Sequence, residues 1–246
     1  MTLLIRNSKK RTQMKGYIFD YGGTLDTAGC HWGRMIWRSY RHCGVPVNWE
    51  QFRQAYIFAE RKLGSRYIIQ PAFTFRDTLD AKLNIEMDYL ESRGFWFASH
   101  LERCSLHARV LDHLYGQVKE ETAKSVDILK KLNKECKLAL VSNFYGNMPV
   151  VLKEFGFEGI FSAVIESAVV GIRKPDARLF ALGVKALGLD AADVTVVGDS
   201  MEKDIVPAKS LGCRTIWIKG EPWEDEPQDT GCADKVITSL EQLLTH

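Results

Sequence analysis

Three carboxylates, a hydroxyl group and an amine stand at positions suited to nucleophilic attack and phosphoryl transfer. Asp20 follows the short apolar run YIF and precedes a glycine turn, as a nucleophile at the end of a strand would. Carboxylates that gather at close range cannot all stay ionised unaided, so such a group favours a hard divalent cation with oxygen ligands. The residues of this set are Asp20, Ser142, Lys174, Asp199 and Asp204.

Each of these stretches has a purely structural explanation when it is taken alone. A strand-end aspartate commonly caps a helix, and a serine–asparagine pair commonly forms a turn. The stretch KPD at 174–176 could simply begin a helix, and GDSMEKD at 198–204 could be a capped turn. Their joint occurrence, in this order and at the ends of apolar runs, favours a single active site.

Short apolar runs of strand length alternate with helical stretches along much of the chain. This alternation predicts an α/β fold with a parallel sheet that helices cover on both faces. Ligands of such sheets bind beyond the carboxyl ends of the strands, where Asp20, Ser142 and Asp199 would all lie. The expected strands are residues 17–20, 137–142, 161–166, 193–199 and 214–219.

The segment from about residue 28 to residue 114 interrupts this alternation. It is rich in aromatic residues and arginines, and spacings such as Trp32, Ile36 and Tyr40 suit amphipathic helices. A helical insertion directly after the first strand would lie close to the active end of that strand. We therefore predict a core from residues 15–27 and 115–246, a helical cap from residues 28–114, and a basic, disordered tail from residues 1–14.

The stretches FDYGGTLD, VSN, GIRKPD and VGDSMEKD resemble the four motifs of the haloacid dehalogenase (HAD) superfamily of hydrolases. The helical insertion resembles that family's helical cap of the first type, and the resemblance covers roughly residues 16 to 240. It implies a Rossmann-like α/β core, a mobile cap, a bound Mg²⁺ ion and an aspartate that is phosphorylated during turnover.

The chemistry expected of these residues begins with Asp20 as the nucleophile, which would split one hard displacement into two easier ones. Lys174 would supply a fixed positive charge, and Ser142 and the amides of the glycine turn would donate hydrogen bonds to the phosphoryl oxygens. A cation held by Asp20, Asp199 and Asp204 would withdraw charge from the phosphoryl group. The resemblance adds Thr24 to the catalytic set, the carbonyl of Gly22 to the metal ligands, and Gly22, Gly23 and Asn143 to the substrate-binding residues.

One carboxylate that the resemblance implies is absent. In most phosphatases of the family the position of Gly22 is an aspartate, which protonates the leaving oxygen and then deprotonates the attacking water. Such groups raise the reaction rate about 10²- to 10⁴-fold. Their loss would slow the reaction of a sugar or alcohol phosphate by that whole factor, and the reaction of an acyl phosphate or a carbon-bound halide far less. Residues that could take over this role are His31, Tyr21, Tyr145 and Asp26. Packing would also explain Tyr21, a place on the first cap helix would explain His31, and the start of the cap linker would explain Asp26.

The expected function is a Mg²⁺-dependent phosphatase that acts on a small phosphorylated metabolite, with three alternatives open. A 2-haloacid dehalogenase also lacks the second aspartate but works without metal, so Asp199 and Asp204 argue against it. Carbon–phosphorus bond cleavage of the phosphonatase type requires a cap lysine, and nothing around Lys62 or Lys82 in the sequence predicts a buried amine with a lowered pKa. A scaffold that binds metal and phosphate without catalysis would explain the lost carboxylate but not the intact nucleophile and lysine.

Composition and charge indicate which classes of partner the protein is expected to bind. Five of the 33 basic residues fall within residues 1–15, so the remainder carries 28 against 31 acidic residues and gives no electrostatic case for nucleic-acid binding. No apolar run approaches the ~20 residues that span a bilayer. Six scattered cysteines without a C-x-x-C pair favour reduced thiols in the cytoplasm. Arg34, Arg38 and Arg66 could meet an anionic substrate, although arginines on a helical surface are more often solvated.

Overall fold

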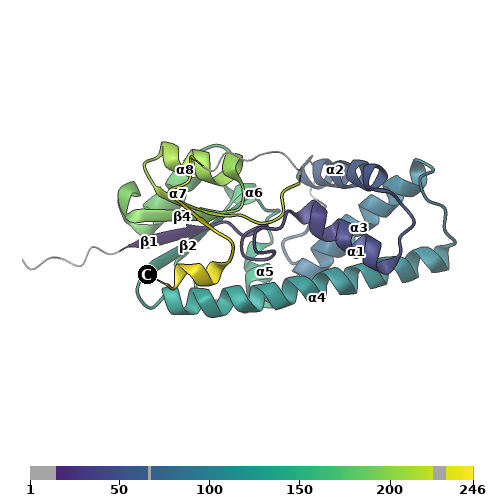
Figure 1. Ribbon diagram of the computed structural model, residues 1–246, viewed down its shortest axis with the longest axis horizontal. Coiled ribbons are helices and arrows are strands. Elements are labelled where there is room, and N and C mark those ends of the chain that lie inside the picture. Colours follow the sequence, from purple (N-terminus) through teal and green to yellow (C-terminus); the bar gives the residue numbers. More distant parts are fainter. Residues whose placement is uncertain (1–14, 66–67, 224–230, 246) are drawn as a thin grey trace, which may run out of the picture.

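The computed structural model describes residues 15–65, 68–223 and 231–245. Their centre is a six-stranded parallel sheet with the strand order β3-β2-β1-β4-β5-β6 (Figure 1). The expectations for the tail at residues 1–14 and for Arg66 lie outside the described residues. The strands are β1 (Gly16–Phe19), β2 (Lys137–Ser142), β3 (Ala163–Glu166), β4 (Val194–Gly198), β5 (Arg214–Ile218) and β6 (Lys235–Ile237).

This sheet confirms the prediction of a Rossmann-like α/β core, and the five expected strands lie within two residues of their expected bounds. The sixth strand was not predicted, because the three residues of β6 are too few to stand out as an apolar run. The central strand β1 pairs with both β2 and β4. The carboxyl ends of the three strands that precede the expected site residues therefore lie side by side.

Helices cover both faces of the sheet. On one face α7 (Arg178–Leu187) and α8 (Val206–Ser210) pack against residues such as Ile18 and Val141. On the other face the C-terminal half of α4 (His100–Leu132) and α5 (Met148–Glu154) pack against Phe19 and Leu140. Neighbouring strand residues enter opposite clusters because successive side chains of a strand point to opposite faces. A short helix, α6 (Ser167–Val170), follows β3.

The cap consists of α1 (Trp32–Cys43), α2 (Trp49–Ser65), α3 (Phe75–Ser92) and the N-terminal half of α4. Capping boxes begin α3 at Thr74 and α4 at Ser99. In each, the hydroxyl of the capping residue accepts a hydrogen bond from the amide of the residue three positions later, and the carboxylate of that residue accepts one from the amide of the capping residue. The expected boundary between residues 114 and 115 falls inside α4. Figure 1 shows this helix running from beneath the sheet to beneath α1 and α3, so it belongs to both parts.

The long helix α4 is amphipathic, with buried Leu111, Leu114 and Val118 at spacings of three and four residues. Its other face is charged and exposed. Neither α4 nor any other helix of the described residues combines the length and the apolarity needed to cross a membrane.

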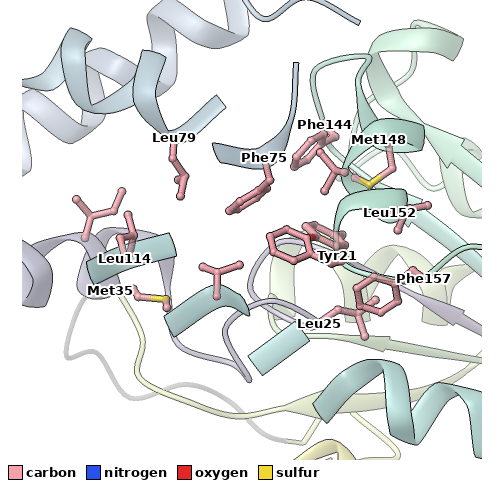
Figure 2. Packing of buried hydrophobic residues seen from close by; sticks show 14 of the residues in the cluster. Tyr21, Leu25, Met35, Phe75, Leu79, Leu114, Phe144, Met148, Leu152 and Phe157 are labelled. Carbon is pink, nitrogen blue, oxygen red and sulfur yellow. The ribbon is translucent and has the colours of Figure 1, made fainter. Parts of the chain in front are cut away.

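An apolar cluster joins the cap to the core. Phe75 of α3 lies beside Tyr21 and Phe144 of the core, whereas Leu79 lies further into the cap, towards Leu114 (Figure 2). The ring of Tyr21 lies 6.3 Å from that of Phe75 and 5.7 Å from that of Phe144, in edge-on geometry. Cap and core therefore share buried apolar surface directly beneath the first motif.

Candidate active site

Three aspartates from two neighbouring strand ends converge on one point. Asp20 follows β1, and Asp199 and Asp204 follow β4. Carboxylate oxygens of the three residues, one from each, all lie within 4.8 Å of one another. Asp20 and Asp204 are buried, and Asp199 is half-buried. The structure thus brings together the three expected carboxylate ligands.

Lys174 places a positive charge between two of these carboxylates. Its ammonium group donates to Oδ1 of Asp20 at 2.5 Å and to Oδ1 of Asp204 at 2.7 Å. Asn143 fixes the lysine backbone, since its Oδ1 accepts from the Lys174 amide at 2.9 Å and its Nδ2 donates to the Lys174 carbonyl at 3.2 Å. The serine–asparagine and lysine motifs therefore act together to position one charge.

Two glycines let the backbone approach the carboxylates. Gly23 has a φ of 99°, and a Cβ on it would lie 2.3 Å from Oδ2 of Asp199. A Cβ on Gly198 would lie 2.4 Å from the Cβ of Asp204. After Gly198 a π-helical turn, Met201–Ile205, carries Asp204 back to the strand end. A side chain at either glycine would displace the carboxylate that it meets.

Burial and mutual repulsion disfavour the charged forms of Asp20 and Asp199. Burial raises the pKa of Asp20 to about 6, with Lys174 opposing the shift and Asp204 adding to it. Burial, followed by the charges of Asp204 and Asp20, raises the pKa of Asp199 well above its usual value. Lys174 supplies one positive charge against three carboxylates. A divalent cation that prefers oxygen ligands therefore fits the donor set of Asp20, Asp199 and Asp204.

A cavity of about 210 Å³ lies in front of the cluster, between core and cap. Its size suits a small organic molecule. The core side includes Asp20, Gly22, Gly23, Ser142, Asn143, Phe144, Tyr145, Arg173, Lys174, Asp199, Lys203 and Asp204. The cap side includes His31, Trp32, Tyr56, Glu60, Phe75, Thr78, Leu79 and Lys82.

Two expected site residues have partners within the site. The Thr24 hydroxyl donates to Oδ1 of Asp199 at 3.2 Å, and Thr24 is not among the described residues that line the cavity. It orients a carboxylate. The amide of Gly23, expected to donate to phosphoryl oxygens, donates instead to Oδ1 of Asp26 at 2.7 Å. This amide therefore holds the turn together.

Asp26 and Trp32 occupy the space beside Gly22. A Cβ on Gly22 would lie 3.7 Å from Nε1 of Trp32 and 4.0 Å from Oδ2 of Asp26, both ordinary contacts. The indole Nε1 of Trp32 donates to Oδ2 of Asp26 at 3.1 Å. Burial raises the pKa of Asp26 well above its usual value. A buried carboxyl group thus lies next to the position of the missing aspartate, although its two oxygens already accept hydrogen bonds.

The other three residues considered as substitutes for that aspartate are placed differently. Tyr21 is packed among aromatic rings and is not one of the described residues that line the cavity. His31 lines the cavity and caps α1, because its Nδ1 accepts the Gly33 amide at 3.1 Å. Burial and then Lys82 lower the pKa of His31 to about 4. Tyr145 also lines the cavity, and burial raises its pKa above the usual value.

The cap contributes an ion pair that sequence reasoning missed. Lys82 of α3 is buried, pairs with Glu60 of α2, and lines the cavity with it. Nothing around Lys82 in the sequence predicted its burial, and the structure buries it. No spacing rule links residues on different helices, but Lys82 does fall on the buried stripe of α3 between Leu79 and Glu86. Lys62, in contrast, lies over the ring of Phe58 on α2 and outside the cavity.

Arg34 and Arg38 of the cap contact Pro222 and Glu221, which lie in the segment after β5. Nε of Arg34 donates to the Pro222 carbonyl at 3.1 Å, and its guanidinium lies over the ring of Trp49 at 4.6 Å. Arg38 forms an ion pair with Glu221. Neither arginine is among the described residues that line the cavity. Their positions give them a structural role at the cap–core boundary.

Comparison with known proteins identifies the family of this chain and supports its fold. The family model for haloacid dehalogenase-like hydrolases matches residues 14–212. Glyceraldehyde 3-phosphate phosphatase from Methanocaldococcus jannaschii is 38% identical over 93 residues, which are 38% of this chain and 40% of that relative, so the match spans about two fifths of its length. A putative HAD-hydrolase from Bacillus subtilis, bound to magnesium, superposes with a TM-score of 0.55 at 16% identity over 94% of this chain and 97% of that one. A dehalogenase with an intermediate complex gives a TM-score of 0.61 at 17% identity over 94% and 96%. At these identities the two structures show the fold alone.

Proposed function

Since this chain belongs to the haloacid dehalogenase-like hydrolases, we propose that it is a Mg²⁺-dependent phosphatase that acts on a small phosphorylated metabolite through an aspartyl-phosphate intermediate. The observation that carries the proposal is the cluster of Asp20, Asp199 and Asp204, with Lys174 bonded to two of its members. Relatives named glyceraldehyde 3-phosphate phosphatase and, in Thermus thermophilus, phosphoserine phosphatase support this reaction class.

In the proposed reaction an oxygen of Asp20 attacks phosphorus, and the bond from phosphorus to the leaving oxygen breaks. Water then attacks the phosphorus of the acyl phosphate, which releases inorganic phosphate and regenerates Asp20. With a pKa of about 6, Asp20 is mostly ionised at neutral pH, as a nucleophile must be. Lys174 holds it in place, and Ser142 lies in the cavity wall where its hydroxyl can donate to phosphoryl oxygens. Mg²⁺, held by Asp20, Asp199, Asp204 and the Gly22 carbonyl, would offset the charge of the phosphoryl group.

Gly22 decides which compounds turn over fastest. Residue 22 gives no proton to the leaving oxygen, so alcohol phosphates should turn over slowly and compounds whose leaving group departs as a stable anion should turn over faster. Acyl phosphates meet this condition better than alcohol phosphates. We therefore expect a phosphatase of modest rate on ordinary esters.

The alternatives have weaker support. Halide displacement in this superfamily needs no metal, whereas this chain keeps three clustered aspartates. Carbon–phosphorus cleavage would need a free cap amine, and the Lys82 ammonium is engaged by Glu60. A non-catalytic scaffold would not require a lysine bonded to the nucleophile.

The proposal extends to the setting of the protein. Residues 15–27 and 115–246 form the core, and residues 28–114 form a cap that opens and closes over the cavity. All six cysteines are free thiols, which fits a location in the reducing cytoplasm.

Hydrolysis of acetyl phosphate and p-nitrophenyl phosphate, with and without Mg²⁺, tests this function. We expect phosphate release that requires Mg²⁺ and that Asp20→Asn and Asp204→Asn abolish. Asp127→Asn, on an exposed position of α4, should keep the wild-type rate. Metal-independent halide release from 2-chloropropionate would support a dehalogenase instead, and absence of turnover on both phosphates would contradict the proposal.

A further inference from the structure

The cap side of the cavity carries its own charged pair, and we propose that Lys82 and Glu60 bind the organic part of the substrate, which makes that substrate a phosphorylated hydroxy acid or amino acid. Lys82 would bind the carboxylate, and Glu60 the neighbouring hydroxyl or ammonium group. This inference rests on the proposed phosphatase function and adds the chemical class of its substrate.

Lys82 uses one of its three donors within the described residues and so has donors left there for a ligand. Its side chain is only 8% exposed, and Glu60 is the hydrogen-bond acceptor that the described residues offer it. Nζ also lies 4.5 Å from the centre of the Tyr56 ring, which covers one side of the ammonium group. An ammonium group carries three donors, and a buried charge is costly unless its donors are used. An acceptor in the cavity would therefore stabilise Lys82.

Within the described residues, Glu60 likewise keeps one carboxylate oxygen without a hydrogen-bond partner. Its Oε1 bonds Lys82, and within the described residues Oε2 has no partner. Burial disfavours the charged form, but the charge and the hydrogen bond of Lys82 outweigh this effect and hold the pKa of Glu60 below its usual value. The side chain is 37% exposed and lines the cavity. A hydroxyl or ammonium donor in the cavity can therefore reach a carboxylate that stays ionised.

The pair faces the phosphoryl site across the cavity. Asp20 and Lys174 line it from the core, and Lys82 and Glu60 from the cap. A cavity of about 210 Å³ leaves room for a phosphoryl group and a chain of a few carbons. Two exposed basic residues, Arg173 and Lys203, also line it, and positive charge at such a cavity favours the entry of anions.

A single functional group on the substrate would not suit this pair. A carboxylate alone would meet Lys82 but also the like charge of Glu60, and an ammonium group alone would meet the reverse. A carboxylate with an adjacent hydroxyl or ammonium group gives each residue its complement through charge-assisted hydrogen bonds. Hydroxy and amino acids carry that combination.

Calorimetric titration of the Asp20→Asn variant in Mg²⁺ tests the pair without turnover. The probes are 3-phosphoglycerate and glycerol 3-phosphate, which differ in a carboxylate against a hydroxymethyl group. Because a hydrogen bond to a charged group is worth roughly 1.5–3 kcal/mol, we expect 3-phosphoglycerate to bind about 10- to 100-fold more tightly.

Second substitutions in the same background assign the effect. Lys82→Met should remove the advantage of 3-phosphoglycerate, and Lys82→Arg should retain part of it. Lys62→Met is the matched control, since this lysine lies outside the cavity, and it should leave the ratio unchanged. Glu60→Gln should weaken O-phosphoserine more than 3-phosphoglycerate, because ammonium depends on the carboxylate charge more than hydroxyl does.

Equal affinities for the two probes in the Asp20→Asn protein would overturn the inference, as would an advantage that survives Lys82→Met in a protein with an unchanged circular dichroism spectrum. Failure of the proposed function is recognised separately, because it shows as a wild-type protein that releases no phosphate from acetyl phosphate.

Discussion

The surroundings of Gly22 have room for a side chain. Its φ lies outside the left-handed region, in contrast to that of Gly23. A Cβ would meet nothing closer than 3.7 Å, and the Trp32 Nε1–H lies within reach of a new acceptor. The position can therefore accept an aspartate without backbone strain, and Asp26 would be its nearest acidic neighbour.

Gly22→Asp should raise the rate on a poor leaving group. For glycerol 3-phosphate we expect a gain in kcat/KM of about 10-fold or more, because a positioned acid contributes about 10²- to 10⁴-fold and the neighbouring Asp26 will hinder its ionisation. Acetyl phosphate should gain much less. The measurement is steady-state kinetics on both compounds.

Gly22→Asn is the matched control, since it adds a similar volume but no acid. If Asn raised the rate on glycerol 3-phosphate as much as Asp did, the role assigned to position 22 would be wrong.

Among the elements, α3 depends on the core for its first turn. Glu154 of α5 accepts the Phe75 amide at 2.5 Å and the Arg76 amide at 3.4 Å, and Tyr115 of α4 donates to the same carboxylate at 2.9 Å. The Thr74 hydroxyl accepts a hydrogen bond from the Asp77 amide. The free amides at the start of a helix are thus shared between the cap's own residues and a core carboxylate.

Glu154→Gln should lower the free energy of unfolding by about 1–2 kcal/mol, because it removes the charge at the helix N-terminus and one of the two oxygens that accept the three hydrogen bonds. Urea denaturation followed by circular dichroism measures this loss. Glu158→Gln, an exposed neighbour in sequence, is the control, and equal stability of the two variants would show that Glu154 does not anchor α3.

The sequence predicts those features whose residues are close together in the chain, and it does not predict those that depend on contacts between separate elements. The strands were predictable because the apolar runs of a buried parallel strand are continuous, as in residues 137–142. The aspartates and Lys174 were predictable because each belongs to a local motif at a strand end. The pair of Lys82 and Glu60 was not, because its two helices meet only through tertiary packing. The amphipathic pattern of α4 continues through the expected boundary at residues 114 and 115, so one continuous helix was predictable there and the expected boundary overlooked it.

On the scale of the whole molecule, stability should depend on pH through the buried Glu86 in the cap. Burial raises its pKa to about 7 from a usual 4.5, although Lys82 and the Tyr40 hydroxyl oppose the shift. The folded protein therefore holds a proton between pH 4.5 and 7 that the unfolded chain releases. Stability from this group is fully present below pH 4.5 and is lost as the pH rises through 7.

Glu86→Gln should remove this part of the pH dependence. Between pH 5 and pH 8 the wild type should lose up to about 3 kcal/mol of unfolding free energy more than the variant does, since each pKa unit is worth about 1.4 kcal/mol. Urea titrations at both pH values in constant Mg²⁺ measure the difference. Parallel pH profiles for the two proteins would contradict the assignment to Glu86.

The central claim is that Asp20, fixed by Lys174 and sharing a cation with Asp199 and Asp204, becomes phosphorylated. Because residue 22 offers no base to activate water, the acyl phosphate should outlive that of an ordinary phosphatase and should accumulate. The most direct test is mass spectrometry after mixing the protein with acetyl phosphate and quenching in acid. We predict one added phosphoryl group on the peptide that contains Asp20, present with Mg²⁺ and absent with EDTA or in Asp20→Asn. Phosphate release without any adduct on that peptide, or an adduct that forms equally well without Mg²⁺, would contradict the account.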